Sequence, residues 1–142
     1  MSKVFVYSRG EYNSLGSSVR NRPTIRIHNI ADRNFYPHYE EDKLVLFFND
    51  EKIMNLSLWR MFKSFWNLED RCLNKKMTIE ILDYLRKNKG KDIIVHCEYG
   101  QSRSVAVAMF LRDYYGYSIV NKKEEELTKY NDWVLMLLKR YN

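Results

Sequence analysis

The segment from Ile93 to Leu111, IIVHCEYGQSRSVAVAMFL, holds a cysteine, a glycine and an arginine at a spacing that could do chemistry together. Three β-branched residues lead into His96 and Cys97, a short polar stretch follows, and an apolar run rich in small residues begins after Arg103. This order predicts a strand, a loop and a helix. Because N–H groups point outward from a helix N-terminus and the helix dipole adds partial positive charge there, the loop is predicted to bind an anion.

The residue types in the loop indicate which anion and which reaction. Gly100 permits a backbone bend that other residues resist, and Arg103 can direct two N–H groups at two oxygens of a phosphate. The Gly-Lys-Ser/Thr ending of a nucleotide phosphate loop is missing. At the start of this anion site, the thiolate form of Cys97 would be stabilised by the same donors. The sequence thus predicts a nucleophile suited to attack on phosphorus, whereas a merely buried cysteine would leave Gly100, Arg103 and Ser104 unexplained.

The pattern HCEYGQSRS resembles the signature of cysteine-dependent protein tyrosine phosphatases, and its glycine in third place after the cysteine is most similar to the dual-specificity branch. Four other segments resemble elements of small bacterial and phage phosphatases of this type: VYSRGEYNSL, TIRIHNIADRNF, LVLFFNDEK and YNDWVLMLL. The resemblance implies an α/β fold, with a small central, mostly parallel sheet flanked by helices.

The resemblance also implies roles for individual residues. Cys97 matches the nucleophile and Arg103 the phosphate-binding arginine. Ser104 matches the hydroxyl that helps the thiolate leave the intermediate, and His96 the residue that tunes and orients the cysteine. The loop whose amides hold the phosphoryl oxygens is matched by Glu98, Tyr99, Gly100, Gln101 and Ser102.

In this family an aspartate on a separate loop protonates the leaving oxygen and later helps to activate water. Asp50 is the leading candidate, because it directly follows the apolar run KLVLFF and FFND resembles the family's strand ending. It lies 47 positions before Cys97, however, which is longer than the usual family gap. Asp70, 27 positions before the cysteine, is the rival, and Glu51 and Glu69 are weaker candidates.

Hydrophobic periodicity predicts the elements that must position these residues. Strands are expected over Lys3–Ser8, Thr24–Ile30, Lys43–Phe48 and Asp92–Cys97. Helices are expected over Leu56–Trp66, Met77–Asn88, Gln101–Gly116 and Glu124–Tyr141. Strands that alternate with helices indicate crossover units, and 142 residues fit one domain, residues 1–142.

The remaining cysteine, the other two histidines and three arginines near the second strand are expected to have structural or surface roles. Cys72 is expected to be a half-buried structural cysteine, with a disulfide to oxidised Cys97 as the alternative. His28 and His38 are expected to be structural or surface histidines. The basic residues near the second strand are expected to form a solvated face: Arg20, Arg22 and Arg26.

The net charge of +6 suits either a soluble surface or anionic partners. No apolar run reaches the roughly 18 residues of a membrane span, and the N-terminus lacks the apolar region of a signal peptide. We therefore expect a cytoplasmic protein, of the cell or of a host cell if a virus encodes it, with no membrane partner. Nucleic acid is not an expected partner either, and the sequence leaves the oligomeric state open.

The expected function is hydrolysis of phosphotyrosine in a phosphorylated protein or peptide through a phosphocysteine intermediate, with phosphoserine and phosphothreonine as further candidates. No metal or other cofactor is expected, since the arginine and the helix N-terminus supply the electrostatic stabilisation. The alternatives are an RNA 5′-triphosphatase, a phosphoinositide phosphatase, or a phosphate-binding module without turnover.

Overall fold

The computed structural model describes residues 1–51 and 71–142, which form an α/β structure around a parallel sheet. In the described part, five strands pair in the order β3-β2-β4-β1-β5, and every pairing between them is parallel. The strands are β1 (Lys3–Ser8), β2 (Thr24–His28), β3 (Lys43–Phe47), β4 (Ile93–Cys97) and β5 (Ser118–Ile119). The fold class predicted from the sequence is therefore confirmed.

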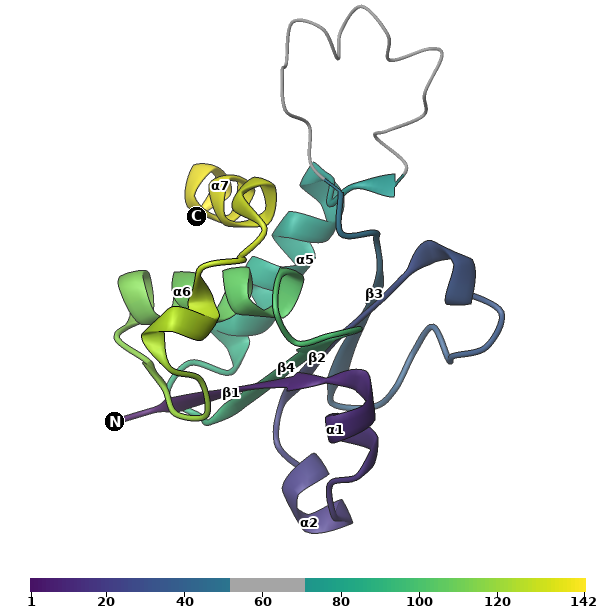
Figure 1. Ribbon diagram of the computed structural model, residues 1–142, viewed down its shortest axis with the longest axis horizontal. Coiled ribbons are helices and arrows are strands. Elements are labelled where there is room, and N and C mark those ends of the chain that lie inside the picture. The colour runs from purple at the N-terminus through teal and green to yellow at the C-terminus, as the bar shows by residue number, and fades with distance from the viewer. Residues whose placement is uncertain (52–70) are drawn as a thin grey trace, which may run out of the picture.

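Helices cover both faces of this sheet. On one face lie α5 (Lys75–Lys87), α6 (Arg103–Tyr115) and α7 (Asp132–Tyr141), and on the other lie α1 (Arg9–Asn13) and α2 (Ser17–Arg20), as Figure 1 shows. Two short 3-10 helices, η1 (Ile30–Asp32) and η2 (Glu124–Leu127), complete the described elements. In this part of the chain, no helix is both long and apolar enough to cross a membrane.

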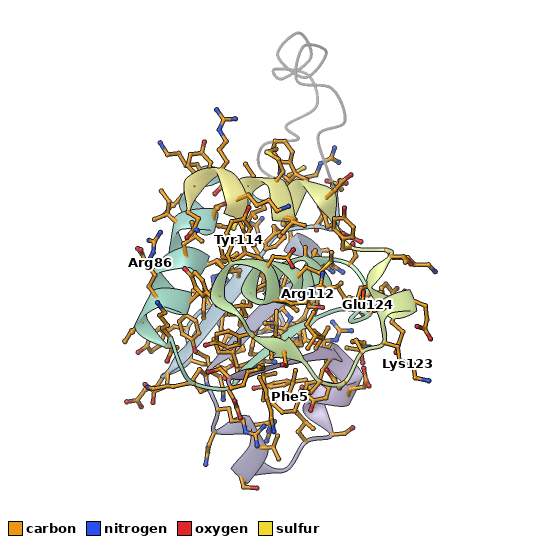
Figure 2. All side chains as sticks on the ribbon, turned by 90° about the vertical axis from the view of Figure 1, so that its left-hand side faces the viewer. Phe5, Arg86, Arg112, Tyr114, Lys123 and Glu124 are labelled. Atoms are coloured by element: carbon orange, nitrogen blue, oxygen red, sulfur yellow. The ribbon has the colours of Figure 1, made fainter. Side chains whose placement is uncertain are left out.

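The hydrophobic core lies mainly between the sheet and the layer formed by α5, α6 and α7. Val4 and Val6 of β1 are fully buried, whereas Phe5 between them is only partly buried. Because side chains alternate along a strand, Phe5 points to the opposite face, where α1 and α2 lie (Figure 2). There the guanidinium of Arg22 sits 4.9 Å from the centre of its ring.

β4 lies in the middle of the sheet, and all five of its residues are buried. Its partners are β1 and β2, and the register places Ser8 beside Cys97 and Arg26 beside His96. Since all the strands are parallel, their carboxyl ends meet at one edge, where ligands bind in open α/β sheets. This arrangement brings the segments after β1, β2, β3 and β4 together.

The helix expected over Glu124–Tyr141 is confirmed only in its second part, and its first part is wrong. The structure has η2, an irregular stretch, and then α7, which begins after Asn131. Asn131 has extended backbone angles, and its side chain accepts a hydrogen bond from the N–H of Val134 at 3.1 Å. An asparagine N-cap of this kind starts a new helix, which hydrophobic periodicity does not detect. The helix expected over Leu56–Trp66 lies outside the described residues.

Candidate active site

The loop that joins β4 to α6 depends on Gly100, which has a φ of +67°. A Cβ atom at this position would lie 2.7 Å from the main-chain N of Ser8 and 2.7 Å from the carbonyl carbon of Tyr7. Side chains of L-residues disfavour this φ, and the contacts are with rigid backbone. Only glycine therefore allows the loop to pack against the end of β1.

Arg9 fixes the same loop from the start of α1. Its main-chain N–H donates to the carbonyl oxygen of Glu98 at 3.2 Å, and its guanidinium pairs with the Glu98 carboxylate at 2.9 Å. The guanidinium also lies 3.4 Å from the carboxylate of Asp32 in η1. These contacts tie the first loop residue after Cys97 to two neighbouring segments.

The loop that leads into α6 has main-chain N–H groups without main-chain acceptors. The N-cap residue of α6, Ser102, makes no side-chain hydrogen bond to the first turn. Among the described residues, the N–H groups of residues 98–102 donate no hydrogen bond to another main-chain carbonyl. Because N–H groups at the start of a helix favour negative charge, this arrangement suits an anion.

Cys97 ends β4 beneath these donors, and its residue is 2% exposed. Its Sγ lies 3.0 Å from the Oγ of Ser104, in the first turn of α6. A hydroxyl can rotate to donate its hydrogen. Ser104 can therefore donate to a thiolate at Cys97, which stabilises the ionised form.

Arg103 is buried, and one of its nitrogens is already engaged. Its Nη1 donates to the main-chain oxygen of Phe48, just after β3, at 2.6 Å. Its Nε is buried and has no hydrogen-bond partner among the described residues. The guanidinium edge formed by Nε and Nη2 is thus the one that can donate two hydrogen bonds to a phosphoryl group. This orphaned donor fits a site whose ligand is an oxyanion.

Asp50 is exposed and is fixed by two donors. Its Oδ1 accepts from the Oγ of Ser102 at 2.7 Å and from the Nδ2 of Asn131 at 2.8 Å. Its Oδ2 has no hydrogen-bond partner among the described residues. That second oxygen is therefore the one available to carry a proton.

A cavity of about 150 Å³ brings these groups together. Its lining includes six of the predicted site residues: Asp50, Cys97, Tyr99, Gln101, Ser102 and Arg103. Tyr99 is 74% exposed at the loop surface, so its ring lies at the open side of the site. The remaining lining residue is Lys129.

His96 precedes the cysteine and is fully buried behind the loop. Its Nε2 accepts a hydrogen bond from the Nε of Arg26 at 3.0 Å, and its ring stacks on Tyr12 with 4.5 Å between centroids. Burial, followed by the positive charge of Arg26, lowers the pKa of His96 to about 3, although the Cys97 main chain opposes the shift. His96 is therefore neutral at physiological pH.

The solvated basic face expected for the second strand is wrong at Arg26. This residue is 8% exposed and forms an ion pair with Glu40. All five residues of β2 are buried, and Tyr12 of α1 and Glu40 of the segment before β3 contact Arg26 on the face that alternation would leave to water. His28, at the end of β2, is also buried and stacks on Tyr36 at 4.2 Å, so of the expected alternatives it is structural.

Two residues at the site were not found by sequence reasoning. Asn131 is buried, and besides holding Asp50 it donates its main-chain N–H to the carbonyl oxygen of Ser102 at 3.1 Å. It thus joins the acid, the loop and α7. The Asn-Asp pair before an amphipathic run is an N-cap signal that could have revealed the helix start, but not the contact with Asp50. Lys129 had no sequence signal.

The other carboxylate candidates are placed less favourably or not described. The side chain of Glu51 pairs with Arg71 at 3.4 Å and does not line the cavity. Asp70 and Glu69 lie outside the described residues. Cys72 is not half-buried but fully buried, and burial raises the pKa of its thiol to about 11. Within the described residues, no group of three or more His, Cys, Asp and Glu side chains could hold a metal ion.

Comparisons with known proteins give little beyond this geometry. No family model matches the chain, and no curated protein matches it. The chain is similar to the crystal structure of human tyrosine phosphatase-like serine/threonine/tyrosine-interacting protein, with a TM-score of 0.39 and 19% sequence identity. The alignment covers 83% of this chain and 74% of that one. A similarity of this extent assigns neither a family nor a function.

Proposed function

We propose that the protein is a cysteine-dependent phosphatase that hydrolyses phosphotyrosine, and also phosphoserine and phosphothreonine, in proteins or peptides. The observation that carries this proposal is the shared cavity of Cys97, Arg103 and Asp50 at the carboxyl edge of the sheet. A nucleophile, a donor for an oxyanion and an acid are the three groups that cleavage of a phosphate ester needs.

In the first step, the Cys97 thiolate attacks phosphorus in line with the ester oxygen. The P–O bond breaks as the S–P bond forms, and the leaving oxygen takes the proton from Asp50. Arg103, through Nε and Nη2, and the amides of the loop stabilise the charge on the three equatorial oxygens. The products of this step are the free alcohol or phenol and a phosphocysteine.

In the second step, water attacks the phosphocysteine while the Asp50 carboxylate takes one of its protons. The S–P bond breaks, inorganic phosphate is released, and the electron pair returns to Cys97 as a thiolate. Ser104 donates its hydroxyl hydrogen to that sulfur, 3.0 Å away, which makes the thiolate a better leaving group. Asp50 regains its proton, so the cycle closes without a cofactor.

The openness of the site supports action on more than one phosphorylated side chain. Asp50 is exposed, and Tyr99 is 74% exposed. A site bordered by such exposed side chains does not restrict the substrate to the long side chain of phosphotyrosine. Broad specificity is therefore part of the proposal.

A second candidate is an RNA 5′-triphosphatase, and one observation favours it. Lys129 lines the cavity beside Arg103, and a second cation suits a substrate with more than one phosphate. Activity on phosphopeptides, RNA 5′-triphosphates and inositol phosphates, assayed at equal concentration, separates these substrate classes. The proposal predicts the highest kcat/KM for phosphotyrosine peptides.

Hydrolysis of an aryl phosphate tests the reaction itself. The parent protein is expected to release phosphate and to be inhibited by vanadate, and Cys97→Ser is expected to be inactive. Hydrolysis by Cys97→Ser at the parent rate would exclude the mechanism. Binding of phosphate without any turnover by the parent would instead identify a binding module.

The pH dependence for a substrate with a poor leaving group tests the acid. The parent is expected to give a bell-shaped profile, and Asp50→Asn to lose the basic limb, because no proton is then available for the leaving oxygen. Asp70→Asn serves as the comparison. Loss of the basic limb in Asp70→Asn alone would assign the acid to Asp70.

A further inference from the structure

A permanently charged side chain is buried directly behind the candidate nucleophile. Arg26, on β2, is 8% exposed, and an arginine cannot lose its proton in a protein. Burying such a charge is costly unless it is paired and hydrogen-bonded. Its Nη1 forms an ion pair with Glu40, and its Nε donates to His96 at 3.0 Å.

The direction of the bond to His96 determines where the imidazole carries its proton. Guanidinium nitrogens only donate hydrogen bonds, so Nε2 of His96 must be the acceptor. In a neutral imidazole one nitrogen accepts and the other carries the hydrogen. The hydrogen of His96 therefore lies on Nδ1, which is buried and has no hydrogen-bond partner among the described residues, although the Cys97 main chain is near enough to affect the pKa of the ring.

We propose that Arg26 is a positioning residue: it holds His96 in the neutral tautomer with its hydrogen on Nδ1 and thereby favours the thiolate form of Cys97. The N–H of Nδ1 adds a positive dipole end to the surroundings of Cys97, the next residue along β4, whereas the other tautomer would present a lone pair from that nitrogen. The positive charge of Arg26, one strand away, acts in the same direction. The consequence for catalysis rests on the proposed function, but the tautomer and the ionisation do not.

Other side chains also lie close to His96, and none of them makes the hydrogen bond that Arg26 makes. Tyr12 of α1 stacks on His96, and His28 of β2 meets its ring edge with 5.4 Å between centroids. The positive charge of Arg9, at the start of α1, also lowers the pKa of His96.

The groups that face Cys97 from the other side come from α6 and from the segment after β3. Ser104 and Arg103 are at the start of α6, and Asp50 shares the cavity. All of these groups are retained when Arg26 alone is replaced. A change in the ionisation of Cys97 can therefore be assigned to Arg26 and His96.

The side-chain nitrogen shifts of His96 in ¹⁵N-labelled parent protein test the tautomer without any variant. We expect a pyridine-type shift for Nε2 and a pyrrole-type shift for Nδ1 at neutral pH. The opposite assignment, or a protonated ring, would overturn the proposal whether or not the protein hydrolyses phosphate esters.

The rate of alkylation of Cys97 by iodoacetamide, measured against pH, tests the consequence. In Arg26→Met, which keeps an apolar stem but removes the donor and the charge, the profile is expected to move to higher pH by about one unit. That shift equals an approximately tenfold lower rate at the acidic end. A profile that coincides with that of the parent would overturn the proposal.

Glu40→Gln is the matched control, because it removes the ion pair of Arg26 but leaves the hydrogen bond to His96. Its alkylation profile is expected not to move to higher pH, because both the donor to His96 and the positive charge of Arg26 are retained. An equal shift in Glu40→Gln and Arg26→Met would show that the ion pair and not the bond to His96 is responsible, and would contradict the proposal. Neither measurement needs turnover, so they are separate from the test of phosphatase activity.

Discussion

At the scale of single residues, the side chains of the candidate site come from different segments of the chain. Cys97 ends the central strand, Arg103 and Ser104 begin α6, and Asp50 follows β3. Arg103 is held by the carbonyl oxygen of Phe48, so the segment that carries Asp50 also orients the arginine. The acid and the anion-binding group are therefore positioned together.

The first prediction concerns Ser104, whose hydroxyl lies 3.0 Å from the sulfur. Ser104→Ala removes a donor to the departing thiolate, and hydrogen bonds to charged groups contribute about 1.5–3 kcal/mol. Breakdown of the phosphocysteine is expected to slow by roughly ten- to a hundredfold, whereas its formation changes less.

Stopped-flow measurement of an aryl phosphate reaction checks this expectation. Ser104→Ala should release a burst of phenol close to one equivalent per enzyme, followed by a slow steady state. Ser118→Ala, which removes a hydroxyl in β5, is the control and should behave as the parent does. A uniform loss of rate in Ser104→Ala without a burst would contradict the assigned role.

At the scale of the elements, two local features determine the shape of the site: the close packing of the loop on β1, and the start of α7. Both involve backbone geometry rather than catalytic groups. Each can be altered by a single substitution for which the chain offers a matched control.

Gly100→Ala tests the close packing of the loop. A left-handed residue other than glycine costs about 1–2 kcal/mol, and here the added Cβ also meets the backbone of Tyr7 and Ser8 at 2.7 Å. Gly90→Ala is the control, because Gly90 has a φ of +87° but no atom within 4 Å of such a Cβ.

Thermal unfolding and aryl phosphate hydrolysis compare the two glycine variants. Gly90→Ala is expected to lose about 1–2 kcal/mol of stability and to keep the parent kcat/KM. Gly100→Ala is expected to lose more stability and most of its activity, because the loop has to move. Equal losses of stability with full activity in both variants would show that the loop does not depend on this contact.

Asn131→Ala tests the start of α7. Removal of an asparagine N-cap typically costs about 1 kcal/mol, and this variant also releases Asp50 from a 2.8 Å hydrogen bond. Asn74→Ala is the control, since Asn74 caps α5 through a 2.9 Å bond to the N–H of Met77.

Urea unfolding should show a loss of stability in both cap variants. Only Asn131→Ala should lose activity, and most of all on substrates with poor leaving groups, which depend on the acid. The assignment of Asn131 to the site would be refuted if both variants kept the parent activity on such substrates.

Elements with strong local patterns could be predicted from the sequence. The run IIVHC and the small-residue stretch after it are recovered as β4 and α6, and Gly116 ends α6 with a φ of +72°. One continuous helix was expected over Glu124–Tyr141 because the acidic residues at its start and the apolar residues after them are compatible with a single amphipathic helix. The structure instead has two elements, η2 and α7. What separates them is the cap at Asn131.

Contacts between segments that are far apart in the chain could not be predicted from the sequence. Arg26 looked like a surface residue because β2 alternates polar and apolar residues, and only the tertiary structure shows its contact with His96. In the same way, no local pattern connects Asn131 with Asp50, which are 81 positions apart. Register within the sheet and the packing of loops decide such contacts.

At the scale of the whole molecule, the two buried histidines predict how stability depends on pH. Burial, with further contributions from nearby arginines, lowers the pKa of His28 to about 4 and that of His96 to about 3. The unfolded chain takes up these protons below about pH 6.5, whereas the folded protein does not. Stability is therefore unaffected by these groups above that pH and falls as the pH decreases towards the folded values.

Urea unfolding between pH 6.5 and 5, where most carboxylates stay ionised, measures this effect. The free energy of unfolding is expected to fall by up to roughly 1.4 kcal/mol per pH unit for each histidine. His28→Gln removes one titrating group, so its slope should be about half that of the parent. A free energy of unfolding that stays constant over this interval would show that the histidines take up protons in the folded protein.

The most direct test of the central claim is the rate at which iodoacetamide alkylates each cysteine of the parent protein as a function of pH. Cys72 serves as an internal control, because it is fully buried and burial raises the pKa of its thiol to about 11. If Cys97 is an ionised nucleophile in an anion site, it reacts rapidly near pH 6, vanadate protects it, and Cys72 stays unmodified. Reaction of Cys97 only in alkaline solution, with no protection by vanadate, would contradict the account.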